Sequence, residues 1–232
     1  MSTAHISNKL KEFKKYLKDF AEYQKSGVED IHRLRVLTRE IFSLLHVEDT
    51  IYKRVKKVIK ISNKIRDLDV FLENYLESLP KRYKTKLDMK SIVDSTNASR
   101  ESEVEKLHAY LKSLIITQST RYADLEEKID FANSSELSLN QMELHKYRIY
   151  IKKVLFREQN SSTPNEKKIK LLKKIKDILG SINDNANGFT RLSEYNIEAN
   201  LLSKIEEFTH KQNLKLFKEF KKSNDKYVKT LL

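Results

Sequence analysis

The chain has no cysteine, and among its 232 residues glycine occurs only three times and proline twice. The lack of cysteine excludes disulfide bonds and thiolate metal sites. A fold rich in β-sheet needs many turns, which glycine and proline supply, so their scarcity favours long helices. No apolar run approaches the roughly 20 residues that cross a lipid bilayer, and no apolar signal core lies near the start. We therefore expect a cytoplasmic protein without a membrane segment.

Positive charge is in clear excess. Lysine and arginine number 46 against 33 aspartates and glutamates, which gives a net charge of +13 at pH 7. The excess is not confined to a tail, because the parts before and after Asn133 are both basic. This balance favours anionic partners, such as nucleic acid, anionic lipid or other polyanions.

Apolar residues recur at spacings of three and four along almost the whole chain, which is the pattern of amphipathic helices. Gly27, Pro80 and the turn at 161–164 mark boundaries between them. We predict helices at about 4–26, 28–47, 49–79, 90–132, 136–160, 165–195 and 197–231.

The sequence contains an internal repeat. The block 32–39 recurs at 145–152, and the block 64–70 has a counterpart at 179–184. The repeat predicts a single all-α domain over 1–232, with a first repeat at about 1–133 and a second at about 134–232. We expect two halves that resemble four-helix bundles and are related by internal pseudo-twofold symmetry.

Each copy carries a row of cations at helical spacing. At 100° per residue, His32, Arg35 and Arg39 share one side of their helix, and Leu34 lies on the opposite side. The second copy follows the same pattern. A charged row is most often a solvated helix face, but such faces usually mix acids with bases. Neither row contains an acid, so we predict that the two rows line one groove.

Arg66 lies on the apolar side of its predicted helix, and this position has two interpretations. It forms a buried ion pair with Asp69 or another carboxylate, or it places a guanidinium at the floor of an anion groove. In the second copy Asn183 replaces Arg66, but Lys176 replaces Ile59 on the same side, so one cation is retained there.

These blocks resemble the CHAD family, the conserved histidine α-helical domain, over essentially the whole chain. The family pattern joins a His-x-x-Arg-Val-x-x-Arg-Arg helix, a Leu-Gly-x-x-Arg-Asp-x-Asp-Val segment and a His-x-x-Arg-x-x-x-Lys-Lys helix. The matching residues are His32, Arg35, Val36 and Arg39 in the first block, Arg66, Asp67, Asp69 and Val70 in the second, and His145, Arg148, Lys152 and Lys153 in the third.

The chain departs from the pattern at two places. Glu40 stands where the family usually has a second arginine, and an acid there would weaken the first row. Ser62 and Asn63 replace the Leu-Gly pair, which the second half keeps as Leu179 and Gly180.

The resemblance implies two four-helix bundles with a central basic groove that binds inorganic polyphosphate, without catalysis and without a metal or cofactor. It also implies a place in the cytoplasm associated with polyphosphate granules. Arginine suits bidentate phosphate contacts and lysine supplies a point charge. Histidine adds charge as the pH falls toward about 6.5, which would strengthen binding. The predicted ligand contacts are His32, Arg35, Arg39, Arg66, His145, Arg148, Lys152, Lys153, Arg157 and Lys176.

Other functions remain open. The same basic surface would suit nucleic acid or an acidic protein partner. An enzyme acting on polyphosphate or a nucleotide would need a carboxylate cluster for a metal ion. No glycine-rich phosphate loop and no His-Glu-x-x-His motif occurs in the sequence, so we predict a binding protein rather than an enzyme.

Overall fold

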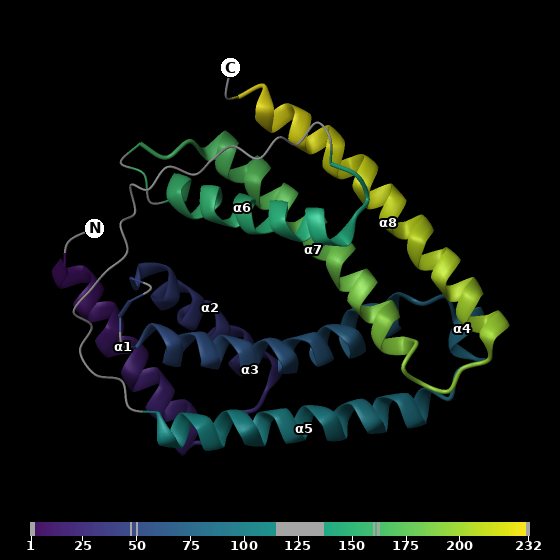
Figure 1. Ribbon diagram of the computed structural model, residues 1–232, viewed down its shortest axis with the longest axis horizontal. Helices are drawn as coiled ribbons and strands as arrows, with labels where there is room; N and C mark the ends of the chain where they lie inside the picture. Colours follow the sequence, from purple (N-terminus) through teal and green to yellow (C-terminus); the bar gives the residue numbers. More distant parts are fainter. Residues whose placement is uncertain are drawn as a thin grey trace. The chain divides into compact units, whose positions relative to one another are not determined.

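The computed structural model describes residues 3–46, 48–49, 51–114, 137–159, 161 and 163–230. Within these ranges every regular element is helical and no β-strand forms, which confirms the predicted all-α class (Figure 1). In chain order the elements are α1 (Thr3–Glu22), α2 (Val28–Leu44), α3 (Tyr52–Val70), the π-helix η1 (Phe71–Leu76), α4 (Lys81–Lys84), α5 (Met89–Ser113), α6 (Gln141–Gln159), α7 (Glu166–Leu192) and α8 (Ala199–Val228).

The helices belong to two compact units. Unit 1 comprises 1–74 and 89–126, and unit 2 comprises 75–88 and 127–232. Unit 1 contains α1, α2, α3 and α5, and unit 2 contains α4, α6, α7 and α8. The segment 75–88 therefore packs with helices that follow it by more than fifty residues, although α5 of unit 1 comes directly after it. None of the described helices is long and apolar enough to span a lipid bilayer.

The core of unit 1 forms where α2 and α3 pack against each other. Leu34 and Ile41 of α2 and Val55 and Val58 of α3 are almost completely buried. Phe20 of α1 is also fully buried. Burial of each large apolar side chain contributes about 1.5–3 kcal/mol, so this interface is a main source of the unit's stability.

Unit 2 is built in the same way from α6 and α7, with α8 packed on α7. Ile151 of α6, Leu172 of α7 and Phe220 of α8 meet in its core. The Tyr147 hydroxyl, buried in this core, donates a hydrogen bond of 2.6 Å to Asn224 Oδ1. A buried hydroxyl with such a partner fixes the register of α6 on α8, because an unpaired one would cost free energy.

The predicted helices are present, but several boundaries differ. α3 begins at Tyr52 rather than near 49, because the buried Asp49 side chain accepts a hydrogen bond from the Ile51 amide (2.8 Å) and forms a turn. α6 begins at Gln141 rather than near 136, because Asn140 accepts from the amides that follow it. α1 ends at Glu22, four residues before the predicted end. The predicted helical residues 115–132 lie outside the described part.

Gly188 of α7 lies against Tyr75, the first residue of the segment 75–88 in unit 2. A Cβ atom at position 188 would lie only 2.6 Å from Tyr75 Cβ. The Tyr75 ring cannot easily move away, because it is buried and its hydroxyl hydrogen-bonds Thr209 of α8 at 3.0 Å. Only glycine at 188 lets this ring approach the helix.

We expect Gly188→Ala to lower the free energy of unfolding by about 1–3 kcal/mol, because overlap with a fixed ring outweighs the roughly 1 kcal/mol that alanine gains in a helix. Gly180→Ala, on the same helix, is the matched control. Its Cβ would meet only the flexible end of Arg148, so the helix gain should remain. Urea denaturation followed by circular dichroism measures both, and equal stability changes would contradict this account.

Candidate polyanion-binding clusters

Three arginines from α2 and α3 gather in unit 1, and we call Arg35, Arg39 and Arg66, together with Asn63, cluster 1. Arg35 Nη2 and Arg39 Nη2 each donate a hydrogen bond of 3.0 Å to Asn63 Oδ1. One neutral acceptor therefore holds two guanidinium groups side by side. A neutral amide compensates much less positive charge than a carboxylate would in its place.

Electrostatics identifies Arg66 as the third member. Burial, followed by the positive charges of Arg39 and Arg66, lowers the pKa of Arg35 to about 10. The carboxylates of Asp67 and Asp69 act in the opposite direction. The Nε atom of Arg35 is buried and has no hydrogen-bond partner within the described structure. The cluster is thus a concentration of positive charge that nearby acids only partly offset.

The ion pair considered for Arg66 does not form with Asp69. Arg100 of α5 takes that carboxylate instead, with Nε 2.6 Å from Asp69 Oδ1, and Arg100 also donates to the Ser26 carbonyl. Asp69 is buried, so its pairing with Arg100 avoids the cost of an isolated charge. Arg66 itself makes no ion pair or hydrogen bond to the described residues.

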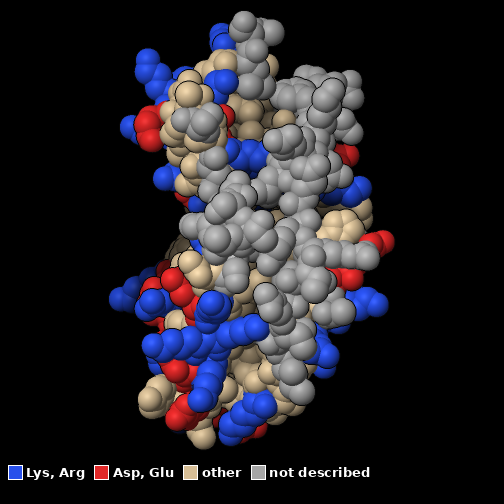
Figure 2. Space-filling view, turned by 90° about the vertical axis from the view of Figure 1, so that its left-hand side faces the viewer, with Lys and Arg blue, Asp and Glu red and all other residues tan. Residues whose placement is uncertain are grey.

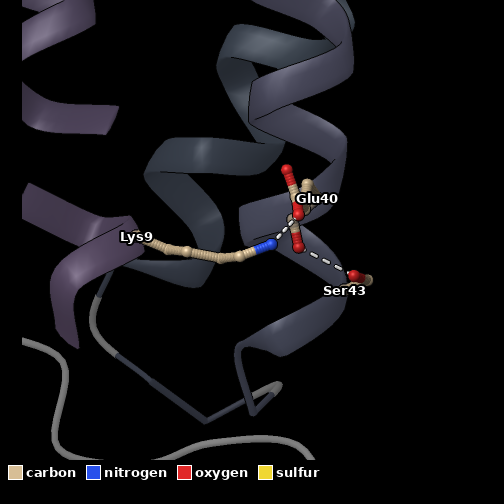
Figure 3. Close-up of polar contacts among 3 residues, drawn as sticks. All are labelled: Lys9, Glu40 and Ser43. Carbon is tan, nitrogen blue, oxygen red and sulfur yellow. Dashed lines mark hydrogen bonds and ion pairs between the residues drawn. The ribbon is translucent and has the colours of Figure 1, made fainter. Parts of the chain in front are cut away.

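Glu40, the acid that replaces an arginine of the family pattern, is paired with a cation from another helix. It pairs with Lys9 of α1 (Figure 3). Ser43 Oγ donates to the Glu40 backbone carbonyl one turn along the helix. The pairing with Lys9 satisfies the carboxylate, so Glu40 need not neutralise the arginines as the sequence suggested.

Cluster 2, in unit 2, comprises Arg148 and Lys152 of α6 with Lys176 and Gly180 of α7. Arg148 Nη2 lies 3.0 Å from where a Cβ of Gly180 would be, so its guanidinium lies directly on α7. The short connection makes α6 and α7 antiparallel, which brings Lys152, one turn after Arg148, level with Lys176, one turn before Gly180. Lys176 pairs with its neighbour Asp177 at 2.8 Å.

The two clusters use corresponding positions of the repeat. Arg35 corresponds to Arg148, and Asn63 corresponds to Gly180. Arg35 of α2 contacts Asn63 of α3, and Arg148 of α6 contacts Gly180 of α7. The sequence pattern placed Asn63 and Gly180 in corresponding blocks but did not predict that an arginine contacts either of them. It did not show that Asn63 accepts from two arginines or that Arg100 occupies Asp69, since both depend on how α3 packs on its neighbours.

The other predicted contacts lie around the clusters rather than in them. His32 and His145 are exposed, each one turn before the arginine of its cluster. Lys153 is exposed and lies about 100° around α6 from Lys152. Arg157 lies about 180° around α6 from Arg148, so cluster 2 does not include it.

Figure 2 shows one face of the molecule, where blue lysine and arginine side chains exceed red acidic ones, in keeping with the net charge of +13. The described residues include no group of three or more histidine, aspartate or glutamate side chains placed to hold a metal ion. Comparisons with models of known families, with characterised proteins and with solved structures found no match to this chain.

The charge excess in cluster 1 predicts that multivalent anions stabilise unit 1. An anion that binds the folded form only raises its stability, and the gain grows with concentration. We expect sulfate to raise the melting temperature more than chloride does at equal ionic strength. Arg35→Gln should reduce this difference, whereas Lys53→Gln, which removes an exposed cation about 20 Å from Arg66 along α3, should preserve it. If sulfate and chloride differ equally in their effect on the melting temperatures of both variants, cluster 1 is not the site at which sulfate acts.

Proposed function

We propose that the protein binds inorganic polyphosphate through clusters 1 and 2 and catalyses no reaction. The observation that carries the proposal is cluster 1, in which two arginines share one neutral acceptor and a third adds charge without an ion pair to the described residues. Such a site attracts a ligand with closely spaced negative charges. Polyphosphate is a flexible chain with about one charge per phosphate, and guanidinium groups match its oxygens in bidentate geometry.

The residue types of cluster 2 are consistent with the same ligand. Arg148 offers a planar fork, and Lys152 a mobile point charge. Neither contact requires a base, a sugar or a fixed ligand shape, so the clusters suit a plain phosphate chain. The resemblance to the CHAD family implies that both copies of the repeat serve one groove, with pseudo-twofold symmetry, and we include this arrangement in the proposal.

Titration with polyphosphate of defined lengths, at several salt concentrations, tests the proposal. Affinity should fall as salt rises, because phosphate contacts release counterions, by analogy with nucleic acids. Affinity should also rise with chain length if one chain reaches both clusters, because the second contact then becomes intramolecular. Duplex DNA of equal charge is the competitor. If DNA displaces polyphosphate at equal concentration, nucleic acid becomes the better assignment.

Charge reversal within the clusters supplies the mutational test. We expect the combined variant Arg35→Glu, Arg148→Glu and Lys152→Glu to lose affinity for long polyphosphate by at least about a hundredfold, since each lost charge-assisted contact costs roughly 1.5–3 kcal/mol. Isothermal titration calorimetry measures the loss. An affinity unchanged in a variant that keeps its helical circular dichroism spectrum would indicate that the cations serve another purpose.

The control for this variant carries the same charge change elsewhere. Lys53→Glu, Lys222→Glu and Lys226→Glu replace exposed lysines of α3 and α8. Long-range attraction weakens equally in both triple variants, but only the first loses the contacts. A similar loss of affinity in the two would mean that net charge alone drives binding. Release of phosphate in the presence of Mg²⁺ or Mn²⁺ would instead point to an enzyme.

Gly180→Ala is a milder test of cluster 2. The added Cβ pushes the Arg148 guanidinium off α7 without touching the core. We expect affinity for polyphosphate to fall about threefold to tenfold while stability is maintained, since one positioned contact is displaced rather than removed. Ser181→Ala alters the exposed neighbouring position and should leave affinity unchanged. If Gly180→Ala leaves the affinity for polyphosphate unchanged, Arg148 is not part of the binding site.

A further inference from the structure

The segment 75–88 and the start of α8 form a cavity within unit 2. Tyr83 of α4 is buried, and its ring lies edge-on to the ring of Phe208 of α8, with the centroids 6.0 Å apart. This contact holds α4 beside the first turns of α8 (Figure 1). The cavity has a volume of about 360 Å³ and is lined by residues within 82–86 and 198–204. We call it the α4–α8 groove, and its volume falls in the roughly 300–1,000 Å³ range of small-molecule sites.

Cations predominate along the α4–α8 groove. Arg82 and Lys86 come from the side of α4, and Lys204 comes from α8. Among the described residues that line the groove, Glu198 is the single acid. Lys86 and Lys204 are exposed, and neither forms an ion pair or a side-chain hydrogen bond with the part of the chain that the structure describes. The groove therefore attracts an anion.

Arg82 is held in position on one wall of the groove. Its guanidinium lies over the Tyr83 ring, 4.8 Å from the centroid, and its Nη2 donates a hydrogen bond of 3.1 Å to the Tyr83 hydroxyl. This bond uses one of the five N–H donors of a guanidinium, so the others remain for a ligand. Because Tyr83 is itself buried, the guanidinium rests on a fixed support and loses less conformational freedom when a ligand binds.

The start of α8 supplies donors to the opposite wall. The N-cap residue Glu198 forms no capping hydrogen bond through its side chain, so it does not satisfy the amide groups of the first turn. The positive end of the helix dipole favours a negative charge at this place. Asn200, in the first turn, also lines the groove, and its side-chain amide can donate two hydrogen bonds.

Donors on two facing walls favour a tetrahedral anion. The two oxygens of a carboxylate lie in one plane, whereas the oxygens of a phosphate point in several directions and can accept from both walls at once. Arginine and lysine are also the common phosphate-binding side chains. We propose that the α4–α8 groove is a binding site for a small phosphate compound, of the size of pyrophosphate or a sugar phosphate. This proposal does not depend on the binding of polyphosphate by clusters 1 and 2.

The groove is separate from cluster 2, although both belong to unit 2. Gly180 of cluster 2 lies about 18 Å along α7 from the end of that helix at Leu192. The groove lies near that end, where the chain turns into α8, and no residue of cluster 2 lines it. A ligand in the groove would instead connect α4 to the start of α8.

Nuclear magnetic resonance of the full chain tests the proposal, with inorganic pyrophosphate as the probe. The backbone amide signals of 82–86 and 198–204 report binding in the groove itself, whatever binds to clusters 1 and 2. We expect these signals to shift and to reach saturation as pyrophosphate is added. Signals that stay in place, or that move in proportion to concentration without saturation, would overturn the proposal.

Removal of the lysines supplies the first mutational test. We expect Lys86→Gln combined with Lys204→Gln to weaken pyrophosphate binding at these signals at least about tenfold, since two charge-assisted contacts are lost. Lys81→Gln combined with Lys215→Gln is the matched control, because it makes the same change of charge on α4 and α8 outside the lining. An equal loss in the two double variants would mean that net charge, and not the groove, sets the affinity.

Removal of the acid should act in the opposite direction. We expect Glu198→Gln to raise the affinity for pyrophosphate about threefold, because the negative charge in the lining is lost. Asp225→Asn makes the same change of charge about 40 Å along α8 and should leave the affinity as it is. If Glu198→Gln does not strengthen binding, the anion is not held beside this residue and the proposed site is wrong.

Citrate separates phosphate recognition from charge. It carries about as much negative charge as pyrophosphate at neutral pH, but its oxygens belong to planar carboxylates. We expect it to bind the groove at least about threefold more weakly, because fewer of its oxygens reach both walls. Citrate that shifts the same signals with equal affinity would overturn the assignment to phosphate compounds.

Discussion

The burial of Arg35 of α2 against Asn63 of α3 determines the electrostatics of unit 1. The Arg35 guanidinium is largely buried, yet its direct side-chain partner is a neutral amide rather than a carboxylate. A buried cation without a full counter-charge is costly, and the cost rises when Arg39 and Arg66 lie nearby. The helices α2 and α3 bury enough apolar surface to tolerate it. The unit thus maintains a local excess of positive charge around Arg35.

The neighbouring ion pairs preserve this imbalance. Arg100 engages Asp69, and Lys9 engages Glu40, so two acids close to cluster 1 are occupied by cations from α5 and α1. If Arg100 were absent, the Asp69 carboxylate would act on Arg35 without a competing partner. The two flanking helices therefore influence the electrostatics of the candidate site without contributing a proposed ligand contact.

Much of this arrangement could be predicted from the sequence. The spacing of Leu34 and Ile41 against His32 and Arg39 placed the core and the cations on opposite sides of α2, as the structure has them. Periodicity works well here because α2 is a regular amphipathic helix. The end of the helix predicted at 49–79 was placed less accurately. α3 ends at Val70, and the π-helix η1 follows it with a different backbone geometry.

The sequence pattern did not predict which side chains of different helices pair with each other. The spacing of Arg66 and Asp69 suggested an ion pair, but the competing partner, Arg100, is thirty-one residues further along. Side-chain rotamers and helix packing decide such competitions, and neither follows from a periodic pattern. Asn63 illustrates the same limit, because its position in the repeat was evident whereas its two arginine donors were not.

The path of the chain between the units has a consequence for biosynthesis. The segment 75–88 leaves the ribosome long before α7 and α8, the helices that receive Tyr75. During translation the Tyr75 side chain therefore lacks its packing partners until α7 and α8 have been synthesised. Division of the chain near residue 133, between the predicted repeats, would place Tyr75 and Gly188 on separate fragments. Unit 2 therefore cannot be completed without the earlier segment 75–88, although most of its core comes from the second part of the chain.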